Sequence, residues 1–355
     1  MLLLDLSGDT NASAKWAAAQ FGQADARAIN KADLKWASKR QALASAREFA
    51  PEVFGIFTID LRTQSRLAAL MLFAVLAGAR QVVIADGNGN TVCRSWLGVL
   101  LLEVPRFALE LLIGYVLIIP LSWLLTEALR TAPLFRPVVR ASRNNKARPR
   151  TWMSALYIRA TLGSTAEGGM PTHVAGFSSG SAALGHRLQF MKSGLRCHDD
   201  LSISIRPSRT FGATKALFEL WNNLVFTATS LAADRASSEE FDFIYQRYSR
   251  FNWTGVALSL MTGLPLALEF NGSEVWVSRH WDPIGQLWLL KRFERLNQRA
   301  ADFIFVVSEV ERRNLIHRGV RPKKVIVNAN GVDTCLLYTS PSPRDRTRSR
   351  MPSSA

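Results

Sequence analysis

The chain has 355 residues, 48% of them hydrophobic, and a formal net charge of +16 at pH 7. This length exceeds that of an ordinary single domain, so we expect two or three folded units. The three cysteines, Cys93, Cys197 and Cys335, show no metal-type spacing. They support neither a disulfide framework nor a zinc site, and a reducing, cytosolic setting fits them best.

The first 92 residues alternate between strand and helix patterns. Residues 1–6 carry an acid inside a short apolar run with no basic region before it, which argues against a signal peptide and favours a first strand. The turn Ser7-Gly8-Asp9-Thr10 could hold a phosphate or be a plain turn, since one glycine falls short of a dinucleotide-binding fingerprint. The patterns predict a small Rossmann-like unit over residues 1–92, with no indication of its role. Strands are predicted at residues 2–6, 27–30, 53–60 and 81–86, and helices at 12–20, 36–48 and 64–77.

The composition then becomes strongly apolar over residues 93–128. The densest part, residues 107–125, holds a single charge, Glu110, and its length is that of a helix that spans a bilayer. Pro105 and Pro120 stand against a simple span, because they could kink the segment into a re-entrant or interfacial hairpin. The segment is therefore predicted to be of membrane type, either spanning or re-entrant.

A basic linker is predicted over residues 129–150. A Lys/Arg excess beside a membrane segment marks the cytoplasmic side and attracts anionic lipid, so we expect the cytoplasmic face of the inner membrane. A solvated flexible linker is the alternative. A nucleic-acid partner is not expected, because residues 144–150 contain no aromatic side chain for base stacking. The basic residues are Arg130, Arg136, Arg140, Arg143, Lys146, Arg148 and Arg150, with no acid among them.

A second α/β unit is predicted over residues 151–334. Its short apolar runs do not alternate and are separated by amphipathic helices, which is typical of a doubly wound parallel sheet buried on both faces. Strands are predicted at residues 155–160, 187–191, 201–206, 241–245, 265–270, 302–307 and 324–328, and helices at 214–232, 253–262, 285–299 and 309–318.

Polar residues directly follow several of these strands. In such sheets ligands bind outside the carboxyl ends of the strands, so we expect one cleft there, although strand ends are also polar simply because they lead into loops. The candidates are Arg247, then Asn271 with Glu274, then Ser308 with Glu309, then Asn330 with Gly331.

A glycine pair lies in the loop after the first strand of this unit. Gly168 and Gly169 let the backbone turn sharply, and Pro171 suits the first turn of a helix whose free N–H groups attract anions. His173 follows in the same helix. Read from residue types alone, the pair could be a structural turn and His173 a histidine on the helix surface.

The stretch ERLNQRAADFIFVVSEVERRNLIHRGVRPKKVIVNANGVD, from Glu294 to Asp333, resembles the end of the N-terminal domain of family 4 glycosyltransferases of the GT-B fold. In that family a strand with an RAD motif, a helix ending near a glycine and an NGVD motif come in this order before an interdomain hinge. The resemblance extends back to Phe241, and the Gly168-Gly169 loop with His173 is similar to the family's loop near the acceptor and the donor phosphates.

The resemblance implies a transferase that moves a sugar from a nucleotide-sugar donor to a glycan or lipid-linked acceptor, with no permanently bound cofactor and no metal. Many members carry a histidine where this chain has Asn271, so Glu274 is an alternative contact to the acceptor. The family's donor site lies mostly in a second domain that would begin after Asp333. No catalytic residue can therefore be named.

Residues 335–355 have no periodicity and are rich in Ser, Pro and Arg. They resemble the translation of a sequencing adapter into which the reading frame runs; a natural disordered tail is the alternative. We therefore expect a truncated chain, inactive as it stands. The alternative function is a non-catalytic, membrane-tethered α/β scaffold or binding module; a basic nucleic-acid binder is favoured least. The basic composition fits an anionic partner, either a membrane surface or a sugar phosphate.

Overall fold

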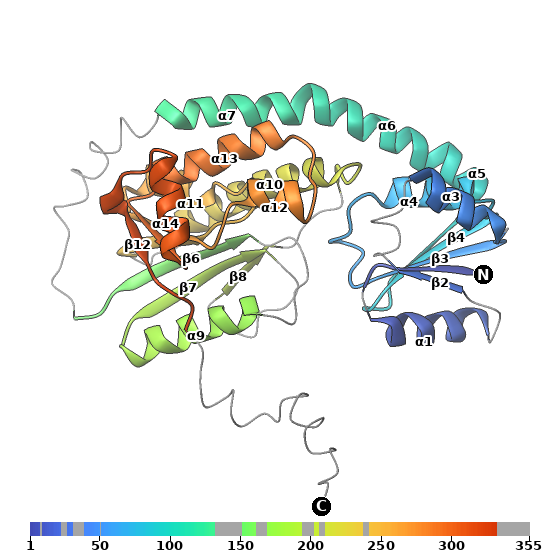
Figure 1. Cartoon of the computed structure of the whole chain (residues 1–355), viewed down its shortest axis with the longest axis horizontal. Coiled ribbons are helices and arrows are strands. Elements are labelled where there is room, and N and C mark those ends of the chain that lie inside the picture. The colour runs from blue at the N-terminus through green and yellow to red at the C-terminus, as the bar shows by residue number, and fades with distance from the viewer. Residues whose placement is uncertain are drawn as a thin grey trace, which may run out of the picture.

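The computed structural model contains two α/β units and one long helix that lies along both of them (Figure 1). The predicted turn at Gly8, most of the basic linker, Gly168 and the tail from residue 332 lie outside the described residues. The structure describes residues 1–7, 9–22, 27–30, 39–49, 51–131, 151–160, 169–193, 202–205, 210–236 and 241–331.

The first unit is built on a five-stranded sheet with the order β2-β1-β3-β4-β5. The first four strands are parallel, whereas β5 runs antiparallel to β4. The edge strand β5 was not predicted, because its alternating, partly exposed residues lack the apolar run of a buried strand. Its elements are β1 (Leu2–Asp5), α1 (Thr10–Phe21), β2 (Arg27–Asn30), α3 (Lys39–Glu48), β3 (Val53–Thr58), α4 (Leu67–Leu76), β4 (Gln81–Asp86) and β5 (Thr91–Ser95).

The second unit is built on a seven-stranded sheet with the order β12-β11-β10-β9-β6-β7-β8. All of its strand pairs are parallel. The strand order reverses between β6 and β9, which is the topological switch point of a doubly wound sheet. The predicted fold, a Rossmann-like sheet preceded by a smaller α/β unit, is confirmed. The strands are β6 (Ser154–Ala160), β7 (Arg187–Ser193), β8 (Ser202–Ile205), β9 (Phe243–Arg247), β10 (Leu266–Phe270), β11 (Phe303–Val306) and β12 (Val325–Val327).

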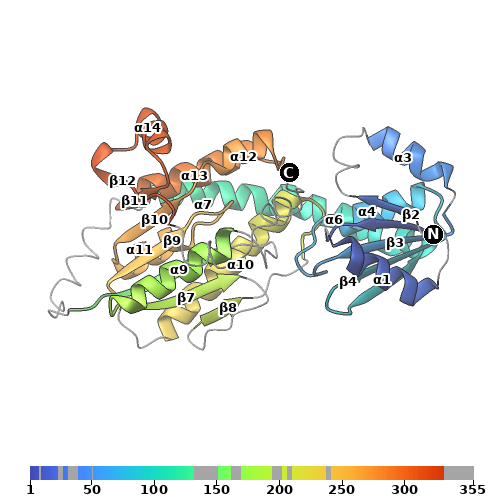
Figure 2. The ribbon, with the colours of Figure 1, turned by 60° about the horizontal axis from the view of Figure 1, so that its bottom comes forward.

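Helices cover both faces of this sheet (Figure 2). One face packs Tyr157, Tyr245 and Ala267 against α9. The opposite face carries the main core, to which α10, α11 and α13 contribute. Helix α12 was not predicted; Ser273 begins it by accepting a hydrogen bond from the backbone N–H of Trp276. The helices are α9 (Gly169–Ala183), α10 (Lys215–Ala236), α11 (Thr254–Thr262), α12 (Glu274–His280), α13 (Leu287–Ala300), α14 (Glu309–His317) and the short 3₁₀ turn η5 (Pro322–Lys324).

The apolar segment forms one continuous helix of 36 residues, Trp96–Thr131. The structure does not form the hairpin that was one of the two alternatives: a wider π-helical turn precedes each proline, so the backbone accommodates Pro105 and Pro120 without reversing direction. By length and composition alone, this helix could cross a membrane. Its parts are α5 (Trp96–Gly98), η1 (Val99–Glu103), α6 (Val104–Ile113), η2 (Gly114–Ile118) and α7 (Ile119–Thr131).

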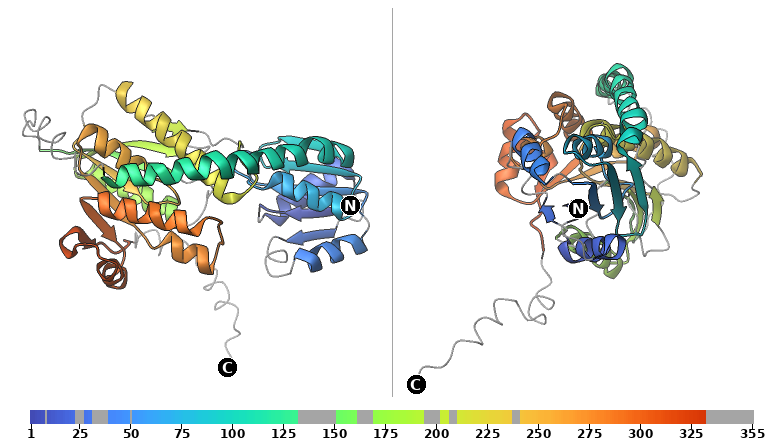
Figure 3. Two further views of the ribbon diagram at one scale, coloured as in Figure 1. Left: turned by 90° about the horizontal axis from the view of Figure 1, so that it is seen from above. Right: turned by 90° about the vertical axis from the view of Figure 1, so that its right-hand side faces the viewer.

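This helix lies against the two units along its length (Figure 3). Val99 joins the core of the first unit, and Ile118 and Ile119 join that of the second. The face turned toward the protein also buries Glu103, Ser122 and Thr126. The outward face is almost wholly apolar, and its exposed side chains include Leu101, Leu102, Leu109, Leu112, Val116, Leu117, Leu121 and Leu124. The helix is thus apolar on its outward face as well as where it meets the two cores, unlike an ordinary surface helix.

Candidate functional site

A buried group of polar side chains lies at the carboxyl end of β9 and β10, on the face that α9 covers. Glu269 is only 4% exposed. Its Oε1 accepts hydrogen bonds from Arg247 Nη1 and from Asn271 Nδ2, both at 2.6 Å. His173 Nε2, from the first turns of α9, lies 3.1 Å from the same oxygen. We call these four residues the Glu269 cluster.

The strand register brings this cluster together. Glu269 of β10 is directly opposite Arg247 of β9. Side chains alternate between the two faces of a strand, so Glu269 points to the same face as Ala267, toward α9, while Leu268 and Phe270 enter the main core. A carboxylate thus occupies a strand position that would ordinarily hold an apolar residue, and Arg247 compensates its charge.

Aromatic rings lie on the same face of the sheet, next to the cluster. Tyr245 stacks on Tyr157 and Phe177, with ring centroids 5.4 and 4.7 Å apart. Burial raises the pKa of both phenols well above their ordinary value, and the charge of Glu269 raises it further. Both tyrosines therefore stay protonated at neutral pH and can act as hydrogen-bond donors.

Two buried oxygen atoms here, Glu269 Oε2 and Tyr157 Oη, have no hydrogen-bond partner among the described residues, and His173 Nε2 has only its 3.1 Å contact with Glu269 Oε1. Buried polar atoms in folded proteins are almost always paired, and exceptions often mark ligand or water sites. Together they offer a carboxylate acceptor, a phenol and an imidazole nitrogen. This combination suits the hydroxyl groups of a polar ligand.

The structure brings His173, Arg247 and Asn271 together, as expected, but engages the other predicted residues elsewhere. Glu274 does not accompany Asn271: it accepts a hydrogen bond from Arg250 Nε at 2.8 Å. Ser308 caps α14 by accepting from Glu311 N, and Glu309 pairs with Arg312 at 2.7 Å. Gly169 is the first residue of α9, and Asn330 and Gly331 are exposed beyond β12.

Glu274 belongs to a second charged group, at the start of α10 and the ends of α12. Arg250 also donates to Asp282 at 2.8 Å and lies 3.8 Å from Glu219. Burial raises the pKa of Glu219 to about 7 despite the nearby charges of Arg250 and Lys215. Burial also disfavours ionised Asp282, but hydrogen bonds from Lys215 and Arg250 prevail and lower its pKa to about 2. This group links α10 to α12.

Sequence reasoning missed Glu269, Tyr157 and Tyr245. The available signal was the single glutamate inside the apolar strand run at residues 265–270. Asn223 is buried and donates to the carbonyls of Glu219 and Arg250. Within the described ranges, no three His, Cys, Asp or Glu side chains are grouped to hold a metal ion.

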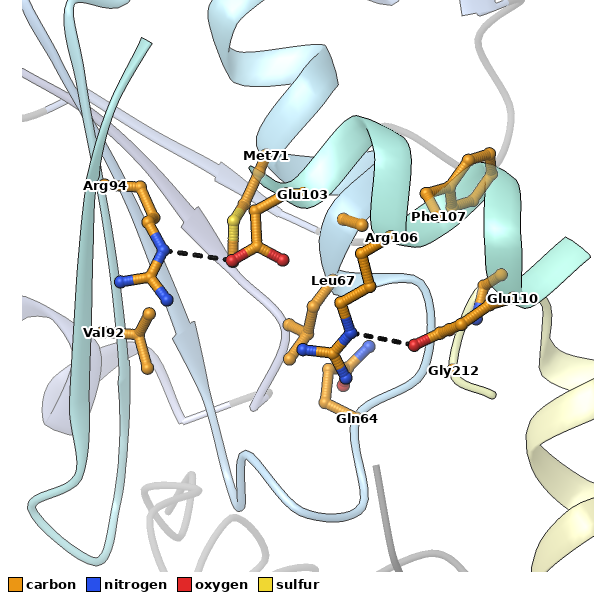
Figure 4. Close-up of a pocket in the computed structure, with 12 residues that line it drawn as sticks. Gln64, Leu67, Met71, Val92, Arg94, Glu103, Arg106, Phe107, Glu110 and Gly212 are labelled. Atoms are coloured by element: carbon orange, nitrogen blue, oxygen red, sulfur yellow. Dashed lines mark hydrogen bonds and ion pairs between the residues drawn. The ribbon is translucent and has the colours of Figure 1, made fainter. Parts of the chain in front are cut away.

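A small pocket of about 80 Å³ lies between the two α/β units (Figure 4). Its charged side chains are already paired: Arg94 with Glu103 and Arg106 with Glu110, each at 3.0 Å. Glu110 also accepts a hydrogen bond from the backbone N–H of Ala213 at 2.9 Å. The pocket is therefore a paired seam between the units, unlike the Glu269 cluster with its unpartnered atoms.

Comparison with known proteins gives one family match. Residues 167–335 match the family model described as Glycosyltransferase Family 4. No curated protein matches the sequence. The chain is similar to the Anabaena protein HepE in complex with UDP, with 16% identity over 56% of this chain and 49% of that one and a TM-score of 0.38. It is also similar to a putative UDP-N-acetylglucosamine 2-epimerase from Listeria monocytogenes, with 12% identity, coverage of 51% and 46%, and a TM-score of 0.36.

The chain spans about half the length of these solved structures. The family match includes α9 and all later described elements, and therefore His173, Arg247, Glu269 and Asn271. Over residues 167–335, this chain matches the Glycosyltransferase Family 4 model.

Proposed function

We propose that this chain supplies the acceptor-side domain of a glycosyltransferase. The complete enzyme would transfer a sugar from a nucleotide-sugar donor to a hydroxyl group of a glycan or lipid-linked acceptor. The observation that carries the proposal is the Glu269 cluster, which places unpartnered buried polar atoms at the carboxyl edge of the sheet within the family segment.

In this proposal, Glu269 Oε2 accepts a hydrogen bond from an acceptor hydroxyl and thereby orients its oxygen toward the donor. Arg247 fixes the position of the carboxylate, since its Nη1 donates to the other oxygen. His173 Nε2 stands beside the same carboxylate and can contact a neighbouring hydroxyl. The first backbone N–H groups of α9 can bind the donor diphosphate at the same edge of the sheet, because helix amino termini favour anions.

We also propose that a second α/β domain, following the segment described here, binds the donor. The family resemblance supports this, since donor contacts in the family come mostly from that domain. Residues 1–331 alone should then bind the acceptor but neither bind nor hydrolyse nucleotide sugars. Calorimetric titration with UDP-sugars and GDP-sugars tests this; donor binding by residues 1–331 would contradict the two-domain proposal.

The activity test uses the reading frame extended into its genomic continuation. Transfer from a panel of nucleotide sugars to glycan and lipid-linked acceptors should be detectable, and Glu269→Gln should reduce it by about 10² or more if the carboxylate orients the nucleophile. Glu48→Gln, an exposed substitution on α3, is the matched control. Full transferase activity in Glu269→Gln would place the acceptor site elsewhere.

We further propose that the chain works on the cytoplasmic face of the inner membrane, with the helix α5–α7 lying in the plane of an anionic bilayer. Support comes from its outward leucines, with Leu101 70% and Leu112 61% exposed, and from the basic residues that follow it in the sequence. The Leu101→Glu/Leu112→Glu variant should no longer float with vesicles. If both chains stay off vesicles and wild type alone dimerises, a second copy covers this face instead.

A further inference from the structure

A groove larger than the pocket between the units lies away from the Glu269 cluster, on the face of the sheet that α9 does not cover. It is a groove of about 620 Å³ between α12, α13 and the turn that joins α14 to η5. Figure 2 shows these elements on one side of the molecule, beside the edge strand β12. Volumes of this order accommodate small organic ligands.

The groove is strongly cationic. Five basic residues on its walls have no side-chain hydrogen bond or ion pair to any described residue: Arg279, Lys291, Arg295, Arg299 and Arg321. Lys291, Arg295 and Arg299 follow one another at intervals of four, so they form a single stripe along α13. Like charges held this close repel one another unless an anion lies between them.

Glu294 is the one carboxylate among the lining residues, and it faces inward. It is 4% exposed and accepts hydrogen bonds from Ser273 Oγ at 2.8 Å and Arg318 Nη1 at 3.4 Å. Its role is to hold the start of α12. Lys324 is also occupied, since its Nζ donates to the carbonyl oxygen of Arg299 at 3.1 Å. The five remaining cations therefore have no anion of the described chain to neutralise them.

Two further side chains point to a ligand. Gln298 is 4% exposed, yet its Nε2 has no hydrogen-bond partner among the described residues. A buried amide N–H without an acceptor is costly, so an acceptor from outside the chain is expected. Trp276, 45% exposed and stacked on His280, adds an aromatic wall. The groove thus combines cations, a neutral donor and a ring.

We propose that this groove binds a ligand bearing a phosphate or diphosphate group. Arginine forks match phosphate oxygens, and several cations around one hollow favour a multiply charged anion over a single carboxylate. The ligand could be the headgroup of an anionic lipid or a soluble phosphate ester, since both present the same chemistry. The proposal does not depend on glycosyl transfer, because the Glu269 cluster lies on the other face of the sheet.

The test compares the wild-type chain with two double variants of equal charge change. Arg295→Glu/Arg299→Glu alters exposed residues inside the groove, whereas Arg313→Glu/Lys323→Glu alters exposed residues outside its lining. The probes are inorganic pyrophosphate, followed by calorimetry, and phosphatidylcholine vesicles with and without phosphatidylglycerol, followed by flotation. Gln298→Leu serves as a third variant that keeps the charge.

We expect the groove variant to weaken anion binding by about tenfold or more and the outside variant by less than about twofold. Gln298→Leu should weaken it several-fold. Loss of pyrophosphate binding alone would identify a soluble ester; loss of the phosphatidylglycerol-dependent part of flotation alone would identify a lipid headgroup. The proposal is overturned if neither probe binds, or if both double variants lose binding equally, which would reflect net charge only.

Discussion

Glu269 is only 4% exposed in the Glu269 cluster, so loss of its partner Arg247 should destabilise that cluster. Arg247→Met would leave the carboxylate buried without its arginine, next to Asn271 and His173. We expect a loss of about 3–5 kcal/mol in the free energy of unfolding. Guanidinium denaturation followed by tryptophan fluorescence measures it.

The double variant Arg247→Met/Glu269→Leu is the control for this prediction. Since it removes both charges and leaves no unpaired carboxylate, it should recover most of the lost stability. If the single variant is as stable as the wild type, the pairing of Arg247 with Glu269 does not stabilise the fold.

Glu219 provides a prediction about pH. Burial raises its folded-state pKa to about 7 from an ordinary value of 4.5. The folded state therefore binds this proton more tightly than the unfolded state does. The resulting stabilisation is fully present below pH 4.5 and is lost as the pH rises through about 7. Glu219→Gln should make the melting temperature less dependent on pH over this interval and raise it at pH 8.

Glu48→Gln, which changes an exposed carboxylate, should leave the pH profile of the melting temperature as it is in the wild type. Identical profiles for the Glu219→Gln variant and the wild type would mean that Glu219 titrates normally. Sequence patterns alone did not single out Glu269 or Glu219, the two carboxylates on which these predictions depend. A glutamate inside an apolar strand is visible in the sequence, but the strand register that brings Arg247 opposite it is not.

At the scale of elements, the sequence predicted most helices and strands because they are long or strongly patterned. It missed β5, whose polar residues alternate at a sheet edge, and α12, whose seven residues depend on the cap at Ser273 and on Glu294. It also left open a hairpin at Pro105 and Pro120, whereas π-helical turns accommodate both prolines in one continuous helix. Such adjustments depend on what the helix packs against, which a local pattern does not contain.

Gly114 marks the place where the long helix crosses α10. A Cβ atom at this position would overlap the side chain of Leu217, which is fully buried. We expect Gly114→Ala to destabilise the chain by about 1–3 kcal/mol, because the core would be overpacked. Thermal unfolding measures the change.

The matched control is Gly180→Ala in α9, where a Cβ atom would meet nothing within 4 Å. That substitution should be neutral or stabilise by up to about 1 kcal/mol, as in an exposed helix interior. An equal effect of the two substitutions would show that helix propensity, and not the crossing, governs Gly114.

At the scale of the whole molecule, sequence analysis predicted two α/β units and an apolar segment between them, but not their arrangement. The seam of paired charges, with Glu110 bound to the backbone of Ala213, joins residues about a hundred positions apart in the chain. A local sequence pattern cannot predict such a contact. In this arrangement the protein buries one face of the apolar segment, including Glu103, Ser122 and Thr126, which bears directly on membrane topology.

A helix in the plane of the bilayer has both ends on one side, whereas a spanning helix has them on opposite sides. Cys93 is exposed just before the helix, and Thr131 is exposed at its end. Two single-cysteine chains therefore report the topology: one keeps only Cys93, and the other has Thr131→Cys with all three natural cysteines replaced by serine. In inverted membrane vesicles, an impermeant maleimide should label both chains to the same extent. Labelling of only one of them would require the helix to leave the two α/β units and cross the membrane. The buried side chains of Glu103, Ser122 and Thr126 would then be exposed to lipid. The proposed in-plane arrangement avoids this cost.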